Sequence, residues 1–323
     1  MSRRSLVLVL TLAAVCLSSA SWGEAYPSRP VRIIVPFGAG GPDTIARVVG
    51  QRLAAQTGQA FIVENRTGAN GIVGTEAVAK APPDGHTVLL VSASFAVNPS
   101  IYKKLPYDTL GEFAPVTNVC ALDAFIFTVN PSVPVQSVEE LIALARKPGS
   151  KLAYGSPGIG NTIHLAGALF NARAGTNLLH VPYKGGGPAI TALLGGEIDA
   201  MFANASLALA HIKAGKLRAL GVTGRSRLPY LPDVPTMAQA GVKGMEFDAG
   251  WFGMFAPAHT PAEVVSKLHG EVRAALGNEQ VRERLQAQGF IPVGNSPAEF
   301  KAYVDSEIKA YAEMVRLAGI EPE

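Results

Sequence analysis

Short apolar runs alternate along the chain with stretches in which apolar residues recur at helical spacing. The run at residues 31–37 is typical of a buried strand, and Ile45, Val48, Val49 and Leu53 then fall on one face of a helix. The same succession of strand and helix returns repeatedly towards the C-terminus. Strand–helix units in this order favour an α/β fold with parallel sheets.

The pattern also predicts where the individual elements lie. Strands are expected at residues 31–37, 61–64, 87–92, 116–119, 125–129, 152–154, 178–181, 200–203, 218–222, 247–256 and 290–293. Helices are expected at residues 42–53, 73–80, 138–146, 162–172, 189–194, 207–213, 262–276, 280–288 and 296–317. The capping boxes Ser-Val-Glu-Glu and Ser-Pro-Ala-Glu open two of these helices, at residues 137 and 296.

These elements fall into two sets, which predicts two domains. The first set is interrupted near residue 125 and resumes near residue 248. We therefore expect one domain from residues 26–125 and 248–323, and a second, inserted domain from residues 126–247. Two linking segments between such domains make a hinge with a cleft, and ligands of open α/β sheets bind beyond the carboxyl ends of the strands.

The N-terminus has the three regions of a secretory signal peptide. Two arginines precede an apolar run at residues 6–17, and a small, polar stretch then ends at Ala25. The apolar run is too short to span a bilayer as a helix. We expect export to the periplasm and removal of residues 1–25, with cleavage after Ala20 as the alternative. The choice between the Sec and twin-arginine routes stays open.

Composition argues against several classes of partner. The chain has 28 basic and 25 acidic residues, a near balance that gives no support to nucleic acid or a membrane surface as a partner. Cys16 lies in the apolar run, so the mature chain keeps Cys120 alone and forms no internal disulfide. No later segment is an unbroken apolar run of about 18 residues, and we expect a soluble, monomeric mature protein.

Three glycine-rich turns stand where an apolar strand passes into a helix. They cover residues 37–43, 156–162 and 185–187. Such turns leave backbone N–H groups exposed and unpaired at a helix N-terminus, where the helix dipole favours negative charge. Each turn is therefore a candidate anion site. The alternative is that glycine only permits a tight turn, as it does in any α/β fold.

Nucleotide and metal motifs are missing from the sequence. Asp43 stands where the dinucleotide fingerprint needs its third glycine, and Lys184 precedes its glycines instead of following them as in a phosphate-binding loop. The 6 histidines are scattered, with no HExxH motif and no Cys/His cluster. We therefore expect no metal and no cofactor. Small anions remain, because two or three N–H donors can hold them.

Polar side chains in or near the turns have two interpretations each. Ser156 is either a nucleophile or a hydroxyl donor to a ligand carboxylate, and the missing Gly-x-Ser-x-Gly elbow favours the donor. The donor role is also expected for Thr162. Asp43 is either a first-turn acid of a helix or an acceptor that fixes the loop or an ordered water. Asp199 either ends a strand or lines the site, and Asn204 is expected to cap the next helix.

Longer motifs carry a resemblance to a known family. Residues 26–44 read Tyr-Pro-Ser-Arg-Pro-Val-Arg-Ile-Ile-Val-Pro-Phe-Gly-Ala-Gly-Gly-Pro-Asp-Thr. Further motifs follow at residues 63–71, 83–85, 154–158, 181–186, 231–236 and 251–257. Together they resemble the Bug family, the extracytoplasmic solute-binding receptors of tripartite tricarboxylate transporters. The resemblance covers essentially the whole mature chain, and so many motifs in order are highly specific.

The resemblance implies a periplasmic-binding-protein-like Venus flytrap, with two α/β domains around a cleft. Backbone amides and ordered waters, with few charged side chains, would enclose a small carboxylate. Matched residue by residue, the ligand-binding residues are Phe37, Gly38, Ala39, Gly40, Gly41, Asp43, Ser156, Gly158, Gly160, Asn161, Thr162, Gly185, Gly186, Gly187 and Asp199. Pro42 departs from the small polar residue that relatives often have, and proline donates no N–H there.

These observations predict a binding protein and not an enzyme. It would close on a small carboxylate and deliver it to the membrane permease subunits of a tripartite transporter. The ligand class stays open among di- or tricarboxylates, acidic amino acids and aromatic acids. Two other functions remain: a sensor module that reports to a signalling partner, and a secreted hydrolase that uses Ser156 or Asp43.

Overall fold

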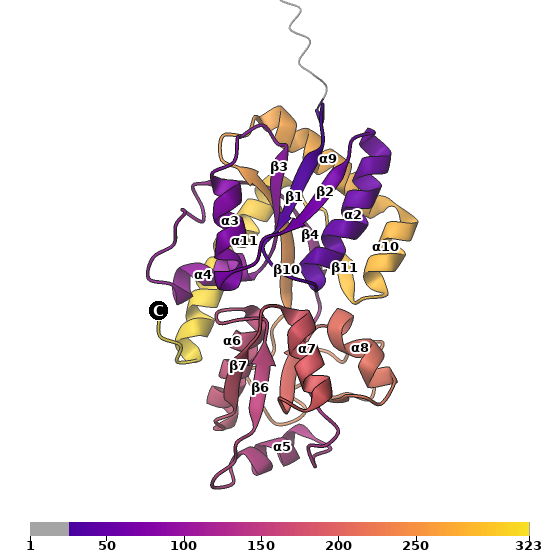
Figure 1. The fold of residues 1–323 in the computed structure, drawn as a ribbon. Coiled ribbons are helices and arrows are strands. Elements are labelled where there is room, and N and C mark those ends of the chain that lie inside the picture. Colours follow the sequence, from indigo (N-terminus) through magenta and orange to yellow (C-terminus); the bar gives the residue numbers. More distant parts are fainter. Residues whose placement is uncertain (1–25, 323) are drawn as a thin grey trace, which may run out of the picture.

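The computed structural model describes residues 26–322 and shows two lobes, one above the other in Figure 1. The first lobe is built on a 6-stranded sheet with the order β11-β4-β10-β3-β1-β2. The second lobe is built on a 5-stranded sheet with the order β7-β6-β8-β5-β9. The expected signal peptide, residues 1–25, lies outside the described residues.

The first lobe takes its elements from both ends of the described chain. The N-terminal part supplies β1 (Val31–Val35), α2 (Gly41–Thr57), β2 (Phe61–Asn65), a 3-10 helix (Ala69–Gly71), α3 (Ile72–Ala79), β3 (Thr87–Ser92), α4 (Ser94–Ile101) and β4 (Phe113–Leu122). The C-terminal part supplies β10 (Gly250–Pro257), α9 (Ala262–Gly277), α10 (Glu279–Gln286), β11 (Phe290–Pro292) and α11 (Pro297–Leu317).

The second lobe uses the segment between these parts. It contains β5 (Ile126–Val129), α5 (Val138–Ala145), β6 (Ala153–Ser156), α6 (Thr162–Ala174), β7 (Leu179–Pro182), α7 (Gly186–Gly195), β8 (Ala200–Ala203), α8 (Ala205–Lys213) and β9 (Arg218–Val222). Each strand and helix predicted from the sequence is confirmed, with ends that differ by a few residues. Within residues 26–322, no helix combines the length and apolar character needed to cross a membrane.

The sequence pattern predicts no helix where α4 lies. Ser94, Phe95, Ala96, Val97, Asn98 and Ile101 of this helix are all buried. A helix buried on most sides shows no apolar stripe with a polar face opposite, so its helical period is hidden. Pro99 inside it weakens the helical signal further.

The predicted parallel sheets are wrong, because both sheets are mixed. β1 pairs in parallel with β2 and β3, and β6 pairs in parallel with β7 and β8. β10 is antiparallel to β3 and β4, and β5 is antiparallel to β8 and β9. The path of the chain explains this: β5 and β10 each follow a crossing from the other lobe, so they run away from the lobe boundary. The carboxyl ends of β1, β3, β6 and β8 face that boundary.

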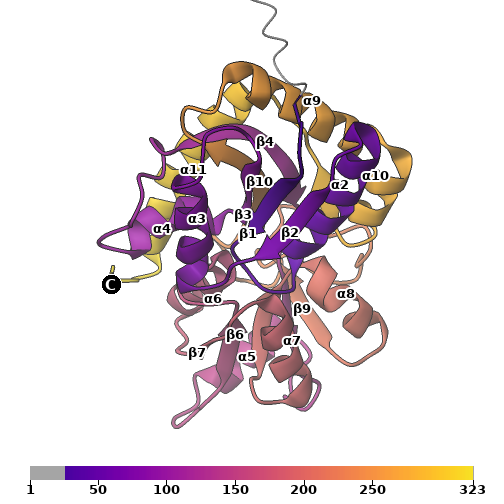
Figure 2. The ribbon, with the colours of Figure 1, turned by 45° about the horizontal axis from the view of Figure 1, so that its top comes forward.

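The apolar run of β1 is buried on both faces of its sheet. Ile33 and Val35 pack in one core with Ile45 and Val49 of α2, whereas Ile34 packs in another core with residues of α3, α4 and α11. A strand covered on both faces reads as a continuous apolar run. Figures 1 and 2 show the covering layers, with α2, α9 and α10 on one face and α3, α4 and α11 on the other.

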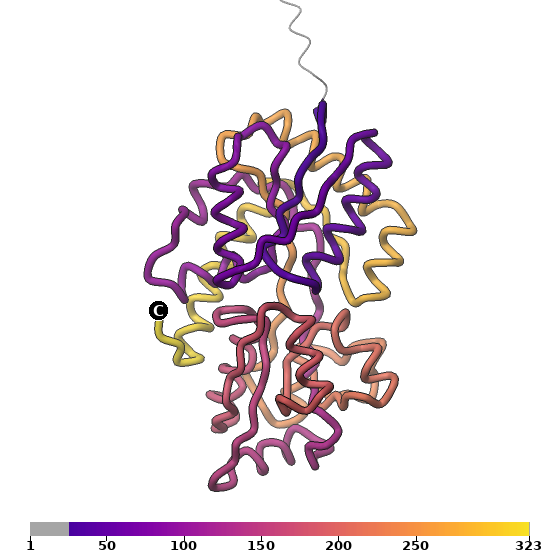
Figure 3. The backbone as a smooth tube through the Cα atoms, viewed as in Figure 1, coloured from indigo at the N-terminus to yellow at the C-terminus, as the bar shows by residue number. Residues whose placement is uncertain are grey.

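The chain crosses between the lobes twice, as the tube in Figure 3 shows. It leaves the first lobe between β4 and β5, at residues 123–125, and returns between β9 and β10, at residues 223–249. Two crossings are what a hinge between lobes requires. The domain limits themselves, residues 26–125 with 248–323 and residues 126–247, stay a prediction.

Candidate functional site

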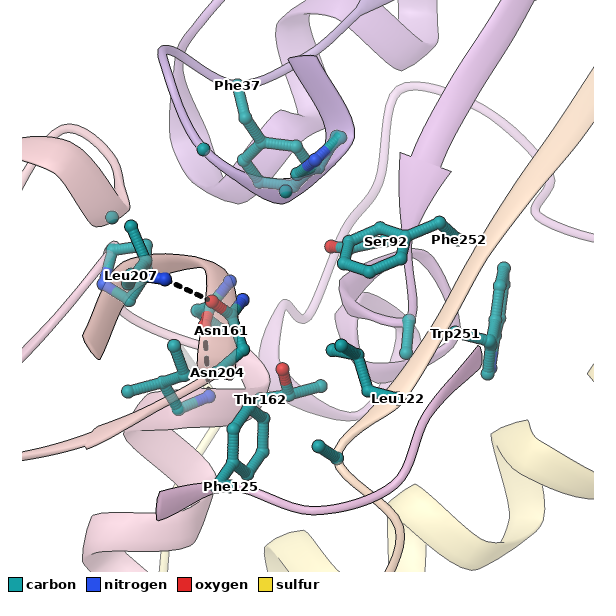
Figure 4. Close-up of a pocket in the computed structure, with 18 of the residues that line it drawn as sticks. Phe37, Ser92, Leu122, Phe125, Asn161, Thr162, Asn204, Leu207, Trp251 and Phe252 are labelled. Carbon is teal, nitrogen blue, oxygen red and sulfur yellow. Dashed lines mark hydrogen bonds between the residues drawn. The ribbon is translucent and has the colours of Figure 1, made fainter. Parts of the chain in front are cut away.

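A cavity lies between the two lobes, where the carboxyl ends of β1, β3, β6 and β8 meet (Figure 4). Its empty space, with the open solvent at its mouth included, is about 550 Å³. Its walls are Phe37, Gly38, Ala39, Gly40, Gly41, Pro42, Ser92, Ala93, Leu122, Phe125, Pro157, Asn161, Thr162, Ile163, Gly186, Asn204, Leu207, Ala249, Trp251 and Phe252. Because both lobes contribute, a molecule bound here would bridge them.

The N-termini of five helices meet at this cavity. The residues that line it are Gly41 of α2, Ala93, the N-cap of α4, Thr162 of α6, Gly186 of α7 and Asn204, the N-cap of α8. Each helix N-terminus carries roughly half a positive charge from its aligned peptide dipoles. None of the lining residues in the described part of the chain is Lys, Arg, His, Asp or Glu. The cavity can therefore attract an anion through main-chain dipoles, without an ionised side chain.

The first glycine turn presents unpaired amides to the cavity. The N–H groups of Ala39, Gly40 and Gly41 have no hydrogen-bond acceptor within residues 26–322. Gly40 adopts φ 153° and ψ −161°, a conformation that residues with a side chain rarely adopt. Consecutive N–H groups that are bared in this way form a concave site for an anion.

Asp43 does not line the cavity but fixes the first turn. Its Oδ1 accepts a hydrogen bond of 2.9 Å from Nδ2 of Asn65, and the same Nδ2 donates to the carbonyl of Phe37 at 2.9 Å. The carboxylate also accepts from Nε of Arg47 at 3.0 Å. Asp43 is thus both a first-turn acid of α2 and an acceptor that holds the loop, and not a wall of the site.

Two donors predicted in the second turn are used inside the turn. The N–H of Gly158 donates to Ser156 Oγ at 3.2 Å, and the N–H of Gly160 donates to His164 Nδ1 at 3.1 Å. Neither amide is free to hold a ligand, and the ligand contacts expected of the two residues stay a prediction. The turn presents Thr162 instead, and its hydroxyl points towards the open centre in Figure 4.

Two hydrogen bonds join the lobes beside the cavity. Nδ2 of Asn161, the N-cap of α6, donates to Ser94 Oγ of α4 at 3.1 Å. The N–H of Gly187 in the third turn donates to the carbonyl of Ala39 in the first turn at 3.4 Å. The N–H of Gly187 is therefore occupied too, whereas that of Gly186 has no acceptor within the described residues and Gly186 lines the cavity.

A second cavity opens beside the first, with about 1,040 Å³ of empty space when the open solvent at its mouth is included. The two cavities share Phe37, Gly38 and Pro157. Gly158 and Gly185, both predicted as ligand contacts, line this second cavity and not the first. The three turns therefore lie close together and divide their residues between two neighbouring cavities.

Ser156 belongs to a buried network beneath the second turn. Its Oγ lies 2.7 Å from His180 Nε2 and donates to the carbonyl of Gly158 at 2.9 Å. The ring of His180 stacks on that of His164, with centroids 3.9 Å apart. Burial lowers the pKa of His164 to about 4. Burial, together with the charge that His164 would carry, lowers the pKa of His180 to about 3. Both rings are neutral at neutral pH, and together they support the turn.

This network does not make Ser156 a nucleophile. Ser156 has 0% exposed surface and lines neither cavity. His180 stacks on a second histidine, whereas the base of a catalytic triad is oriented by a carboxylate. Ser156 therefore holds the turn, and its contact with the ligand stays a prediction.

We expect the free energy of unfolding to decrease as the pH falls from about 6.5 towards 4. Both histidines have the ordinary pKa of 6.5 when unfolded and a lowered pKa when folded. The unfolded chain therefore binds protons in this window and the folded chain does not, so acid favours unfolding. Melting temperatures measured between pH 7.5 and 4.5 test this.

The matched control removes both titrating rings. In the double variant His164→Gln with His180→Gln, the melting temperature should change less between pH 6.5 and 4.5 than in the unmodified protein, even where the variant is less stable throughout. An unmodified protein whose melting temperature is constant over this range would contradict the assignment.

Asp199 lines neither cavity, and its contact with the ligand stays a prediction. It lies before the N-terminal end of β8, whereas the opposite end reaches the cavity through Asn204. Its Oδ2 accepts a hydrogen bond of 2.7 Å from the N–H of Ala153, at the start of β6. Asp199 therefore joins the ends of two parallel strands far from the site.

The sequence interpretation missed much of the cavity wall. The missed residues are Pro42, Ser92, Ala93, Leu122, Phe125, Pro157, Ile163, Asn204, Leu207, Ala249, Trp251 and Phe252. Ser92 ends β3, a parallel neighbour of β1. Because ligands of open α/β sheets bind beyond the carboxyl ends of the strands, Ser92 could have been predicted as a wall residue. Leu122 and Phe125 border a crossing between the lobes. Apolar residues give no such signal, because in sequence a cavity wall resembles a core.

Within residues 26–322, no group of His, Cys, Asp or Glu side chains is arranged to hold a metal ion. What the cavity offers is a set of unpaired amides at helix N-termini, a few hydroxyl and amide side chains, and apolar surface. This combination suits a small organic anion held by hydrogen bonds.

Comparison with known proteins relates this arrangement to a family. The model described as "Tripartite tricarboxylate transporter family receptor" matches residues 45–320. The UPF0065 protein in the tcbD-tcbE intergenic region of Pseudomonas sp. (strain P51) is 38% identical, over 97% of this chain and 94% of its own length. Protein BugT of Bordetella pertussis is 36% identical, over 99% of this chain and 98% of its own length.

Solved structures of the same kind superpose on the whole described fold. The periplasmic binding protein BugD has a TM-score of 0.87 at 36% identity, over 92% of this chain and 100% of its own. Rpa4515 of R. palustris, solved with adipate, has the same TM-score, identity and coverage. MatC of Rhodopseudomonas palustris, solved with malate, has a TM-score of 0.82 at 31% identity, over 90% of this chain and 100% of its own.

Proposed function

The chain belongs to the TctC, or Bug, family of tripartite tricarboxylate transporter receptors, and on that premise we propose that it captures a small carboxylate and delivers it to membrane permease subunits. One observation carries the proposal: the unpaired amides of two glycine turns and the N-termini of five helices converge on one cavity between the lobes. A carboxylate has two oxygens that each accept hydrogen bonds, so donors on different sides of the cavity can bind it at the same time.

Capture would be a closure of the two lobes around the ligand. Donors come from the first turn in one lobe and from Thr162 and Gly186 in the other, so a carboxylate between them favours the closed form. The bonds from Asn161 to Ser94 and from Gly187 to Ala39 would form on closure. The crossings at residues 123–125 and 223–249 would act as the hinge.

The cellular setting follows from the family and the N-terminal segment. We propose a periplasmic, monomeric protein whose residues 1–25 are removed on export. Adipate and malate, named for two solved relatives, support a small organic acid as the type of ligand. The family is one of receptors, which supports binding without chemical change.

A thermal-shift screen tests this proposal. The mature protein is unfolded and refolded to remove co-purified ligand, then melted with citrate, malate, succinate, adipate, aspartate, glutamate and benzoate. At 100 times its dissociation constant, a ligand adds about 2.7 kcal/mol to the free energy of unfolding. At least one acid should raise the melting temperature by several degrees, and mass spectrometry should recover that acid unaltered.

Conversion of the bound acid would favour the hydrolase interpretation. The matched control is glycerol, a neutral molecule with hydroxyl groups and no carboxylate, which should leave the melting temperature unchanged. If no acid of the panel shifts the melting temperature, carboxylate capture is contradicted.

A further inference from the structure

The second glycine turn is held in place by one ring nitrogen. Nδ1 of His164, in the first turn of α6, accepts the N–H of Gly160 at 3.1 Å. Gly160 is buried and adopts φ 73°. A buried N–H that loses its acceptor is costly, because it finds neither water nor another partner. The position of Gly160 therefore depends on an acceptor at His164.

The segment that His164 holds lies against the first lobe. A Cβ added to Gly160 would lie 3.1 Å from Nδ2 of Asn70 and 3.1 Å from Cγ2 of Ile101, which both belong to the first lobe. Asn161, the next residue, donates the hydrogen bond that joins α6 to α4. Thr162 then lines the cavity (Figure 4). The bond between the two lobes and the wall of the cavity thus follow directly on the residue that the histidine ring fixes.

The ring of His164 can hold Gly160 only while it is neutral. Nδ1 accepts a hydrogen bond only when it carries no proton, and a protonated Nδ1 would face the N–H of Gly160 as a second donor. The titratable side chains that face this ring within residues 26–322 are His180 of β7, with centroids 3.9 Å apart, and Tyr154 of β6, at 6.5 Å. Neither supplies a negative charge at neutral pH, so a proton on the ring would have no counter-charge.

We propose that His164 is a positioning residue for ligand capture: its neutral ring holds Gly160 against the first lobe, and a proton on Nδ1 releases the second turn and weakens binding. The proposal rests on the proposed function and adds a control of the same site by protons. A ligand that closes the lobes keeps the ring in its neutral form. Because coupling between two binding equilibria is reciprocal, protons then oppose ligand binding.

The direction of the pH effect follows from the two forms of the protein. Burial lowers the pKa of His164 to about 4 in the closed form that the structure describes. In an open form, Gly160 would leave Asn70 and Ile101, and we expect the pKa of the less constrained ring to lie nearer its ordinary 6.5. The open form then binds more protons between these two values. The affinity for an acid should therefore decrease as the pH falls through this window.

Two variants of His164 test the positioning role by calorimetry at pH 7.5 on the refolded, ligand-free protein. His164→Asn keeps an oxygen acceptor near the place of Nδ1, whereas His164→Leu has a similar size and no acceptor. Both variants lack the ring that stacks on His180. The probes are citrate, malate, succinate, adipate, aspartate, glutamate and benzoate. Each probe that binds the unmodified protein should bind the asparagine variant at least about 10-fold more tightly than the leucine variant.

The outcomes of this comparison separate the two proposals. Equal affinities in the asparagine and leucine variants would overturn the positioning role of His164 and leave carboxylate capture intact. If no probe binds the unmodified protein, carboxylate capture is contradicted and the positioning role is overturned with it.

A pH profile distinguishes positioning from structural support alone. Between pH 6.5 and 4.5, the affinity of the unmodified protein should fall at least about 3-fold more than that of the double variant His164→Asn with His180→Gln, in which neither ring remains. Protonation of the probe itself affects both proteins equally and cancels in the comparison. Melting temperatures at pH 4.5 check that both are folded. An equal decline in the two proteins would contradict proton control. If the leucine variant does not fold, this comparison decides the question.

Discussion

A negative charge at position 162 is expected to abolish ligand binding without destabilising the protein. In Thr162→Asp, the new carboxylate lies in the first turn of α6, where the helix dipole stabilises it by about 0.3–1 kcal/mol. The same carboxylate would face the bound acid in the cavity. Two like charges about 4 Å apart repel by about 4 kcal/mol at an effective dielectric constant of 20. Calorimetry should show an affinity at least about 100-fold lower.

The control for this prediction keeps the shape and removes the charge. Thr162→Asn has nearly the same size as the aspartate and can still donate a hydrogen bond, so its affinity should stay within about 10-fold of the unmodified protein. Equal affinities for the aspartate and asparagine variants would mean that no anion lies near α6. The melting temperature of both variants checks that the fold is retained.

Gly40→Ala is expected to weaken carboxylate binding at least about 100-fold. A Cβ at this position meets no atom within 4 Å, but the backbone at φ 153° is one that alanine avoids. The turn would relax and redirect the unpaired amides of Gly40 and Gly41. Each hydrogen bond to a charged group contributes about 1.5–3 kcal/mol, so the loss of two explains the expected effect. Calorimetry with the best acid of the panel measures it.

Gly58→Ala, at the other end of the same helix, is the matched control. Gly58 follows α2 with φ 71°, and a Cβ there also meets nothing within 4 Å. Alanine should therefore cost stability through the same kind of backbone strain while leaving the affinity unchanged, because Gly58 is far along α2 from the cavity. An equal loss of affinity in both variants would show that strain in α2, and not the direction of the amides, determines binding.

The secondary structure was predictable because its signals are local. The apolar run of β1 and the helical spacing of Ile45, Val48 and Val49 each lie within one element, and so do the glycines that turn the chain into α2. The parallel order of the sheets was not predictable in this way. Strand direction in β5 and β10 depends on which lobe the chain has just left, which no local pattern contains.

The same limit applies to the candidate site. The glycine turns can be read from the sequence, but the sequence could not show that His180 and His164 lie under the second turn or that the amide of Gly160 is already used. Nor could it show that Asp199 lies at the end of β8 opposite the cavity, bonded to the start of β6. Side-chain partners 24 residues apart, as for Ser156 and His180, emerge only when the strands are paired.

Amide chemical shifts in ¹⁵N-labelled protein test the central claim most directly. With the acid of the panel that binds most tightly, the amide protons of Gly40, Gly41, Thr162 and Gly186 should move downfield more than any others as the ligand saturates the protein. If these four resonances stay in place while the largest changes occur elsewhere, main-chain donors at the helix N-termini do not hold the acid.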